Sequence, residues 1–284
     1  MEHNSGHLGS ALPAAYFSSA SSSFADFLRA QAPELLPGGN VAGSSVRSAA
    51  DLPHGTTIVA STFAGGVLIA GDRRATAGNQ IASRDMDKVR ITDGYSAVAI
   101  AGTAGLALEL VRLYEVELAH YEKIEGVPLS LDGKTNKLGT MVKANLEIAM
   151  AGLAVVPLFV GYDTEATDPK RAGRIVSYDV TGGRYEENGG FHAIGSGSLF
   201  AKSALKKLYD PDADVDAAVR AAVESLYDAA DDDTATGGPD LVRRIFPTVV
   251  TITERGAEFV SASQIAAVSE AVVNGRAEHA DRQG

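Results

Sequence analysis

From residue 56 onward, apolar residues recur in blocks that alternate between the two-residue period of strands and the longer period of helices. The first block holds two β-branched runs, 56–60 and 67–70, separated by Gly65 and Gly66. Such runs joined by glycines predict a β-hairpin. The same reasoning predicts further strands at 95–101, 155–162, 174–179, 184–185, 191–194, 248–253 and 257–260.

Apolar residues at helical spacing predict helices between the strand groups. Thr103 is a plausible N-cap for the first helix, which would bury Leu110 and Leu113 on one face. A second helix, at about 135–151, would turn Ile148 toward the core. Further helices are expected at 198–209, 215–230 and 263–274.

The predicted order of elements is strands, two helices, strands, two helices, strands and a final helix. Most consecutive strands are joined by tight turns, which indicates antiparallel sheets. Pairs of helices between strand groups indicate helix layers on the outside of packed sheets. The sequence therefore predicts an α+β fold.

Residues 1 to about 55 differ from the rest because they are rich in Ser, Ala and Gly, with turn formers at 37–40 and 43–45. This composition buries too little apolar area to offset the entropy of ordering. Within it, the spacing of apolar residues in 23–36 is compatible with a short amphipathic helix. Two interpretations remain open for this region, a removable propeptide that docks transiently and a disordered tail.

Composition excludes several classes of function. The 284 residues are 45% hydrophobic and 21% charged, which suits one domain plus an appendage. A net charge of −11 argues against nucleic acid or an anionic membrane surface as the main partner. The chain has no cysteine and its six histidines are scattered, so we expect no disulfide, metal or other cofactor.

No apolar run reaches the ~20 residues of a membrane helix, and the N-terminus lacks a basic signal-peptide region. These features predict a cytoplasmic protein.

The hairpin at 56–71 is the candidate for chemistry. A turn centred on Ala64 would place Thr56 opposite Asp72, and a turn centred between Gly65 and Gly66 would place it opposite Ala75. Either register brings the Asp72 carboxylate within a few residues of the Thr56 hydroxyl. On these residues alone, an ordinary surface hairpin is an equal alternative.

Motifs that carry a family resemblance stand in order from Thr56 to about Gly275. They are Thr56-Thr57-Ile58-Val59, Gly71-Asp72-Arg73-Arg74-Ala75-Thr76, Lys88, Ala101-Gly102, Ile194-Gly195-Ser196-Gly197 and Asp233-Thr234-Ala235-Thr236-Gly237-Gly238. In this order and spacing they closely resemble the proteasome β-subunit, a threonine protease of the N-terminal-nucleophile (Ntn) hydrolases. The Ala-rich, acidic composition and the long leader look most like the actinobacterial form.

The resemblance implies a four-layer α-β-β-α sandwich of two antiparallel sheets. It also implies that residues 1–55 are a propeptide removed on maturation and that 56–284 form the catalytic domain, with the last ten residues as a flexible tail. Self-cleavage of the Gly55–Thr56 bond would free the α-amine of Thr56. A free α-amine has a reference pKa of about 7.7–8.0, so near neutral pH it can accept the proton of the hydroxyl on the same residue.

By the same resemblance, Lys88 would lower the pKa of that amine and stabilise the threonine alkoxide, while Asp72 keeps Lys88 charged and in place. The Gly102 N–H, at a strand end that opens a helix, would bind the oxyanion. Ser196, Asp233 and Thr236 would form a hydrogen-bonded shell around the amine; the family usually has serine at the last position. The alternatives stay open that Asp72 and Lys88 form a structural ion pair and that Ser196 and Thr236 are turn residues.

Substrate binding is also inferred from the resemblance. Backbone groups of Thr76, Gly102 and Ala104 would pair with an extended peptide. The pocket for the residue before the cut would be lined by Ala75, Met86, Arg90, Ile100, Ala104 and Leu108. Because most of these are apolar, we expect cleavage after large apolar residues, with Arg90 as the exception in the lining.

The resemblance implies a partnership with other β-subunits in a heptameric ring, two such rings stacked face to face, α-subunit rings at both ends and an ATPase regulator ring. Unfolded polypeptides, tagged by a small ubiquitin-like modifier, would be the substrates. Two alternatives compete with this hypothesis: an N-terminal-threonine amidohydrolase acting on a small amide, and a non-catalytic ring scaffold. The family motifs argue against the first, and intact Thr56, Asp72 and Lys88 argue against the second.

Overall fold

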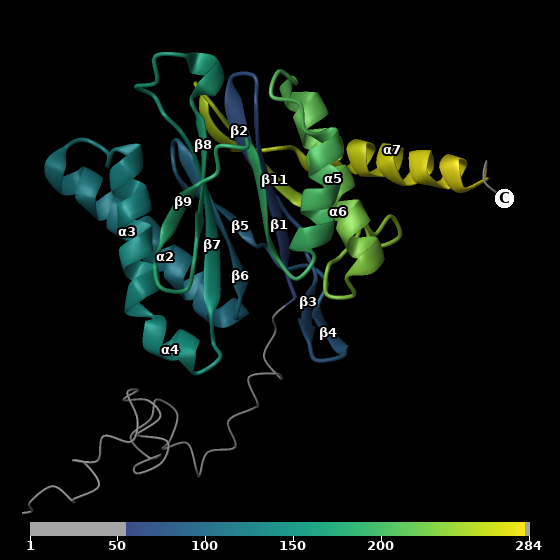
Figure 1. The fold of residues 1–284 in the computed structure, drawn as a ribbon, viewed down its shortest axis with the longest axis horizontal. Helices are drawn as coiled ribbons and strands as arrows, with labels where there is room; N and C mark the ends of the chain where they lie inside the picture. The colour runs from purple at the N-terminus through teal and green to yellow at the C-terminus, as the bar shows by residue number, and fades with distance from the viewer. Residues whose placement is uncertain (1–54, 282–284) are drawn as a thin grey trace, which may run out of the picture. The chain divides into compact units, whose positions relative to one another are not determined.

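The structure, a computed structural model, describes residues 55–281, with side chains to residue 278. The propeptide interpretation and the helix expected at 23–36 lie outside these residues. The described chain forms two five-stranded antiparallel sheets with helices on their outer faces (Figure 1). This arrangement confirms the predicted α+β fold class.

The first sheet has the strand order β10-β1-β2-β11-β12. Along β1 and β2, Ile58 and Ile69 face the core between the sheets, whereas Val59 and Leu68 face the helices on the other side. The strands are β1 (Thr57–Phe63), β2 (Gly66–Gly71), β10 (Phe191–Gly195), β11 (Thr248–Thr253) and β12 (Gly256–Phe259). The covering helices are α5 (Ser198–Leu208), α6 (Val215–Asp232) and α7 (Ala262–Asp281).

The second sheet has the order β5-β6-β7-β8-β9. Here Ala97 and Leu158 face the core between the sheets, and Val98 and Phe159 face the helices α2 and α3. The strands are β5 (Val89–Asp93), β6 (Ser96–Gly102), β7 (Val155–Tyr162), β8 (Gly173–Tyr178) and β9 (Arg184–Glu186). The helices are α2 (Ala104–Glu125) and α3 (Leu131–Ala144).

Three apolar cores therefore separate four layers, one between the sheets and one beneath each helix layer. The central strands are buried on both faces, which is why they read as continuous apolar runs rather than as alternating ones. Figure 1 shows α2 and α3 on one side of the stacked sheets and α5 and α6 on the other.

The register of the opening hairpin differs from both predicted registers. Ile58 pairs with Gly71 and Phe63 with Gly66, so the turn centres between Ala64 and Gly65. Asp72 consequently lies beside Thr57, whose carbonyl accepts the Asp72 N–H at 3.1 Å. The two predicted registers miss it by one and by two residues, because the left-handed φ of +90° falls on Gly65 and not on Gly66.

The single helix predicted at 135–151 is broken. Helix α3 ends at Ala144 and a short helix α4 (Leu146–Met150) follows. The Asn145 side chain donates to the Met141 carbonyl at 2.9 Å, and this local bond competes with continuation of the helix. Ile148 on α4 and Leu113 on α2 are 39% and 51% exposed, so both expectations of burial were wrong.

Several elements carried no prediction. They are strands β3 (Ala75–Ala77), β4 (Gln80–Ser83) and β5, and a 3₁₀ turn, η4 (Pro169–Arg171). Helix α7 continues past Asn274 to Asp281, into the stretch assigned to a tail, where Arg276, Ala277, Glu278 and Ala280 are good helix formers. Within residues 55–281, no helix has both the length and the hydrophobicity needed to cross a membrane.

Candidate active site

Thr56 directly precedes β1 and is 5% exposed. Its hydroxyl Oγ1 donates to the carbonyl oxygen of Gly55 at 2.6 Å. Its own carbonyl oxygen accepts the Ser196 N–H at 2.9 Å, which anchors it to the end of β10. The hydroxyl therefore touches the carbonyl of the bond that would be cut to free the Thr56 amine.

Asp72 follows β2 and is fully buried. Its Oδ1 accepts the Thr57 N–H at 2.7 Å and the Lys88 Nζ at 2.6 Å. Its Oδ2 accepts the backbone N–H groups of Arg74 and Gly237, both at 2.9 Å. Four donors satisfy this buried carboxylate, so its position is fixed by backbone as well as by the lysine.

Lys88 directly precedes β5 and is 7% exposed. Besides Asp72, its Nζ donates to the Gly55 carbonyl oxygen at 3.1 Å and to the Arg74 carbonyl oxygen. Burial lowers the pKa of the Lys88 ammonium, and the carboxylate of Asp72 acts in the opposite direction. The ammonium and the Thr56 hydroxyl thus converge on one carbonyl oxygen.

A second network lies on the other side of Thr56. The Ser196 hydroxyl donates to Asp233 Oδ2 at 2.6 Å, and the Thr236 hydroxyl donates to the same oxygen at 2.5 Å. Asp233 caps the end of α6, and its N–H donates to the Ala229 carbonyl at 2.9 Å. The carboxylate therefore holds both hydroxyls at the edge of the site.

Thr57 joins the two networks, and sequence reasoning gave it no role. Its Oγ1 accepts the Gly197 N–H at 2.9 Å and lies 2.6 Å from Thr236 Oγ1. Since the single hydroxyl proton of Thr236 is directed to Asp233, the proton between the two threonines comes from Thr57. The signal available in the sequence was its position between Thr56 and a buried apolar run.

Gly102 ends β6 with a left-handed φ of +116°. A Cβ there would lie 2.2 Å from the Ala154 carbonyl oxygen, so the backbone conformation requires glycine. The next N–H, of Thr103, donates to that carbonyl at 3.1 Å. N–H directions alternate along an antiparallel strand, so the Gly102 N–H points away from β7, on the side of β6 that pairs with β5. That pairing has already ended at Ala99.

A pocket opens beside Thr56 and Gly102. The six side chains expected from the sequence to form it all line it, and Asp87, Ala107 and Val111 are additional. Thr76 is not among its lining residues, but its hydroxyl lies against Gly55, where a Cβ would approach it to 2.5 Å. Ala107 and Val111 follow Ala104 at helical spacing, which was the signal that would have found them.

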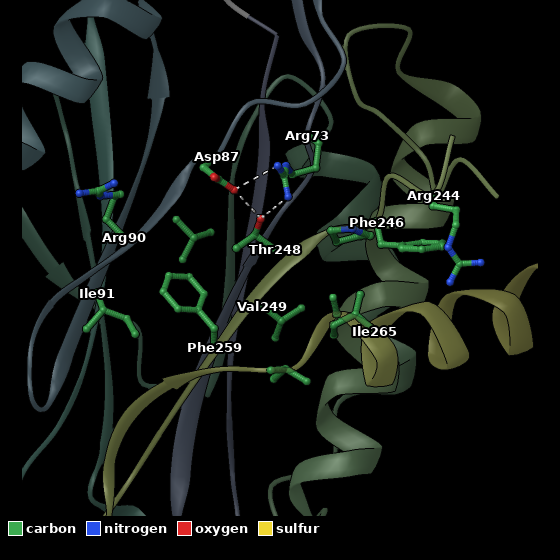
Figure 2. A pocket seen from close by; sticks show the side chains of 14 residues that line it. Arg73, Asp87, Arg90, Ile91, Arg244, Phe246, Thr248, Val249, Phe259 and Ile265 are labelled. Carbon is green, nitrogen blue, oxygen red and sulfur yellow. Dashed lines mark hydrogen bonds and ion pairs between the residues drawn. The ribbon is translucent and has the colours of Figure 1, made fainter. Parts of the chain in front are cut away.

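A wider groove lies on the other side of β5 and is shown in Figure 2. Apolar side chains including Phe246, Phe259 and Ile265 form its floor. Asp87 and Arg90 line both this groove and the pocket beside Thr56. The two cavities therefore share a wall.

The structure thus brings Gly55, Thr56, Asp72, Lys88, Gly102, Ser196, Asp233 and Thr236 into one site.

Comparison with known proteins gives one consistent result. The family model described as "Proteasome subunit" matches residues 52–242. A "Proteasome subunit beta" of Saccharomonospora viridis is 69% identical over 289 residues, covering 100% of both chains. One of Saccharopolyspora erythraea is 68% identical, with 94% of each chain covered, and "Proteasome subunit beta 1" of Rhodococcus erythropolis is 63% identical, with 92% covered.

Proposed function

The chain belongs to the proteasome subunit family, as a relative of its β-subunits, and on that premise we propose that it is a threonine endopeptidase of a proteasome core, activated by cleavage between Gly55 and Thr56. One observation carries the proposal. The Thr56 hydroxyl and the Lys88 ammonium contact the same Gly55 carbonyl oxygen, at 2.6 and 3.1 Å.

In the maturation step, Thr56 Oγ1 attacks the Gly55 carbonyl carbon. The carbonyl oxygen gains negative charge, which the Lys88 ammonium stabilises. The peptide C–N bond then breaks as the nitrogen takes up the hydroxyl proton, leaving Gly55 esterified to Thr56. Water hydrolyses this ester, which releases residues 1–55 with a terminal carboxylate and leaves Thr56 with a free amine.

In the peptidase reaction, the freed amine accepts the Thr56 hydroxyl proton while Oγ1 attacks a substrate carbonyl. The ammonium of Lys88, held in place by Asp72, stabilises the negative charge of the Thr56 alkoxide. The Gly102 N–H is the proposed donor to the oxyanion. The amine of the departing peptide takes the proton, and water then cleaves the acyl ester. Ser196, Asp233 and Thr236 form the hydrogen-bonded shell around the α-amine of Thr56.

The proposed substrates are unfolded polypeptides, cut after large apolar residues that enter the pocket beside Thr56. An extended chain would pair with backbone groups near Thr76, Gly102 and Ala104. Family membership implies assembly with other proteasome subunits. We extend this to heptameric β rings between α-subunit rings, fed by an ATPase ring with substrates carrying a small ubiquitin-like modifier, so that digestion is processive inside a chamber.

The decisive experiment compares the wild type with Thr56→Ala after co-expression with an α-subunit. Mass spectrometry of the assembled wild type should give an N-terminus at Thr56, and the variant should keep its leader. Thr56→Ser serves as the matched control, because it retains a hydroxyl and should still mature. Normal removal of the leader in Thr56→Ala would show that another protease does the cutting and would overturn self-cleavage.

Two further measurements separate the alternatives. Labelling of Thr56 by a threonine-directed electrophile is expected for an enzyme and not for a ring scaffold. A panel of fluorogenic peptides set against small amides distinguishes an endopeptidase from an amidohydrolase. Preference for small amides would contradict the proposed substrate class.

A further inference from the structure

Arg90 is one of three charged residues, with Asp87 and Lys88, in a substrate pocket whose other lining residues are mostly apolar. It lies on β5 and lines the pocket beside Ile100, Ala104 and Leu108. An unpaired guanidinium there would favour an acidic side chain in the substrate and disfavour an apolar one. The specificity of the pocket therefore depends on what Arg90 is bound to.

The partner of Arg90 is Glu115. Arg90 Nε donates to Glu115 Oε1 at 3.1 Å and Nη2 donates to Oε2 at 3.3 Å, a two-point contact between planar groups. The hydrogen bond and the negative charge of Glu115 raise the pKa of Arg90. Figure 2 shows the Arg90 guanidinium directed away from Arg73 and Asp87. Asp87 instead contacts Arg73 at 3.3 Å and Thr248.

The position of Glu115 on α2 explains how its side chain contacts Arg90 although Glu115 itself does not line the pocket. Ala104, Ala107 and Val111 line the pocket from one face of α2. Glu115 is one turn beyond Val111 on that face, and side chains of a helix lean toward its N-terminus, which is toward the pocket. The Glu115 side chain is 26% exposed and that of Arg90 is 42% exposed. Glu115 is thus placed to hold the guanidinium at the pocket's rim.

We propose that Glu115 is a specificity-determining residue that acts through Arg90: by neutralising and holding the guanidinium, it keeps the pocket selective for apolar residues, and without it the pocket accepts acidic ones. This inference rests on the proposed peptidase function. Glu115 is a positioning residue, because it acts on the substrate through Arg90 and not by contact with the reacting atoms.

The test uses Glu115→Gln in the assembled, mature protein. Two fluorogenic peptides differ in the residue before the cut, one carrying leucine and the other glutamate. We expect the ratio of kcat/KM for glutamate over leucine to rise about tenfold, because the freed guanidinium gains a charge-assisted partner in the substrate. The rise should shrink as salt is added, since the site is partly exposed to solvent. Glu115→Ala frees the guanidinium by a second route.

The matched control is Glu117→Gln on the same helix. Glu117 pairs with Lys137 at 2.7 Å and does not line the pocket, so this variant removes the same charge and one ion pair elsewhere. A second comparison places Glu115→Gln in an Arg90→Met background, where it should leave the ratio unchanged.

Three results would overturn the inference. In the first, Glu115→Gln shifts the ratio no more than Glu117→Gln does. In the second, both peptides lose activity equally, which is the result expected of a merely structural role. In the third, the shift persists without Arg90. A wild type that cleaves neither peptide and resists labelling at Thr56 would overturn the proposed function itself, whereas an active wild type with an unmoved ratio refutes this inference alone.

Discussion

At the scale of single residues, Thr57 shows how closely the site depends on one hydroxyl beside the proposed nucleophile. Its N–H binds Asp72, and its Oγ1 links the Gly197 N–H to Thr236. The proton order runs from Gly197 through Thr57 and Thr236 to the Asp233 carboxylate. Each hydroxyl is oriented by the next group in the chain. Thr57 therefore couples the orientation of the Asp233 carboxylate to the start of β1, next to Thr56.

Replacing Thr57 by valine should expose this dependence. Valine has nearly the same shape and suits a strand, but it leaves the buried Gly197 N–H without an acceptor. We expect a loss of about 1–3 kcal/mol in unfolding free energy and slower release of the leader. Thr57→Ser keeps the hydroxyl and should retain the rate of release. Denaturant unfolding and a time course of N-terminal processing measure both effects; equal behaviour of the two variants would refute the role of the hydroxyl.

At the scale of elements, the junction between β6 and α2 positions both the proposed oxyanion donor and the pocket. Gly102 ends the strand, and Ala104 begins the helix whose face lines the pocket. The left-handed backbone of Gly102 makes this change of direction within two residues. A small displacement there would move the N–H and the pocket wall together.

Gly102→Ala should therefore damage both stability and activity. The added methyl would lie 2.2 Å from the Ala154 carbonyl oxygen, at a backbone angle that alanine rarely adopts. We expect a cost of at least about 1–3 kcal/mol in unfolding free energy and loss of peptidase activity. Gly105→Ala is the matched control three residues on, because nothing lies within 4 Å of its added methyl.

Thermal unfolding and peptide hydrolysis should separate the two variants, with Gly105→Ala at or above wild-type stability. Wild-type stability and activity of Gly102→Ala would contradict the requirement for glycine at this junction.

Some helices and strands could be predicted from the sequence and others could not. The strands around Thr56 and the helix from Ala104 followed from apolar periodicity, because long buried runs carry the strongest signal. The pocket residues came from the family resemblance rather than from periodicity. Neither signal predicted β3 and β4, because these strands are short and partly exposed and so lack an apolar pattern.

The remaining errors have physical causes that can be traced to particular residues. The hairpin register depends on which residue adopts the left-handed conformation, and composition alone does not choose between Gly65 and its neighbours. The break at Asn145 depends on one side-chain bond to Met141. Thr57 was missed because its function lies in contacts to residues 140 and 179 positions away, and its place beside Thr56 does not identify those partners.

At the scale of the whole molecule, several large apolar side chains remain exposed in the described chain. Leu199 is 78% exposed, Met150 73% and Val242 91%. Single exposed apolar side chains are normal on protein surfaces, so these three residues do not by themselves mark an interface.

The two sheets are also joined by a titratable contact outside the active site. His192 on β10 of the first sheet has its Nδ1 3.0 Å from Glu187. Glu187 in turn accepts the hydroxyl of Ser177, on β8 of the second sheet, at 2.6 Å. Lys202 of α5 lies 3.5 Å from the same imidazole nitrogen. Burial lowers the pKa of His192, with Glu187 opposing this and Lys202 reinforcing it.

This contact predicts a loss of stability in mild acid. Because the folded-state pKa of His192 lies below its ordinary value of about 6.5, the unfolded chain binds the proton first as the pH falls. The unfolding free energy should then decrease below about pH 6.5, by at most about 1.4 kcal/mol per pH unit from this group. His192→Gln removes the titration and should lose less stability than the wild type between pH 7.5 and pH 5.5.

His120→Gln, at an exposed position on α2, is the matched control and should follow the wild type. Urea unfolding of the three full-length proteins at both pH values gives the comparison. A pH-dependent loss in His192→Gln equal to that of the wild type would show that carboxylates elsewhere, and not this imidazole, make the joined sheets sensitive to acid.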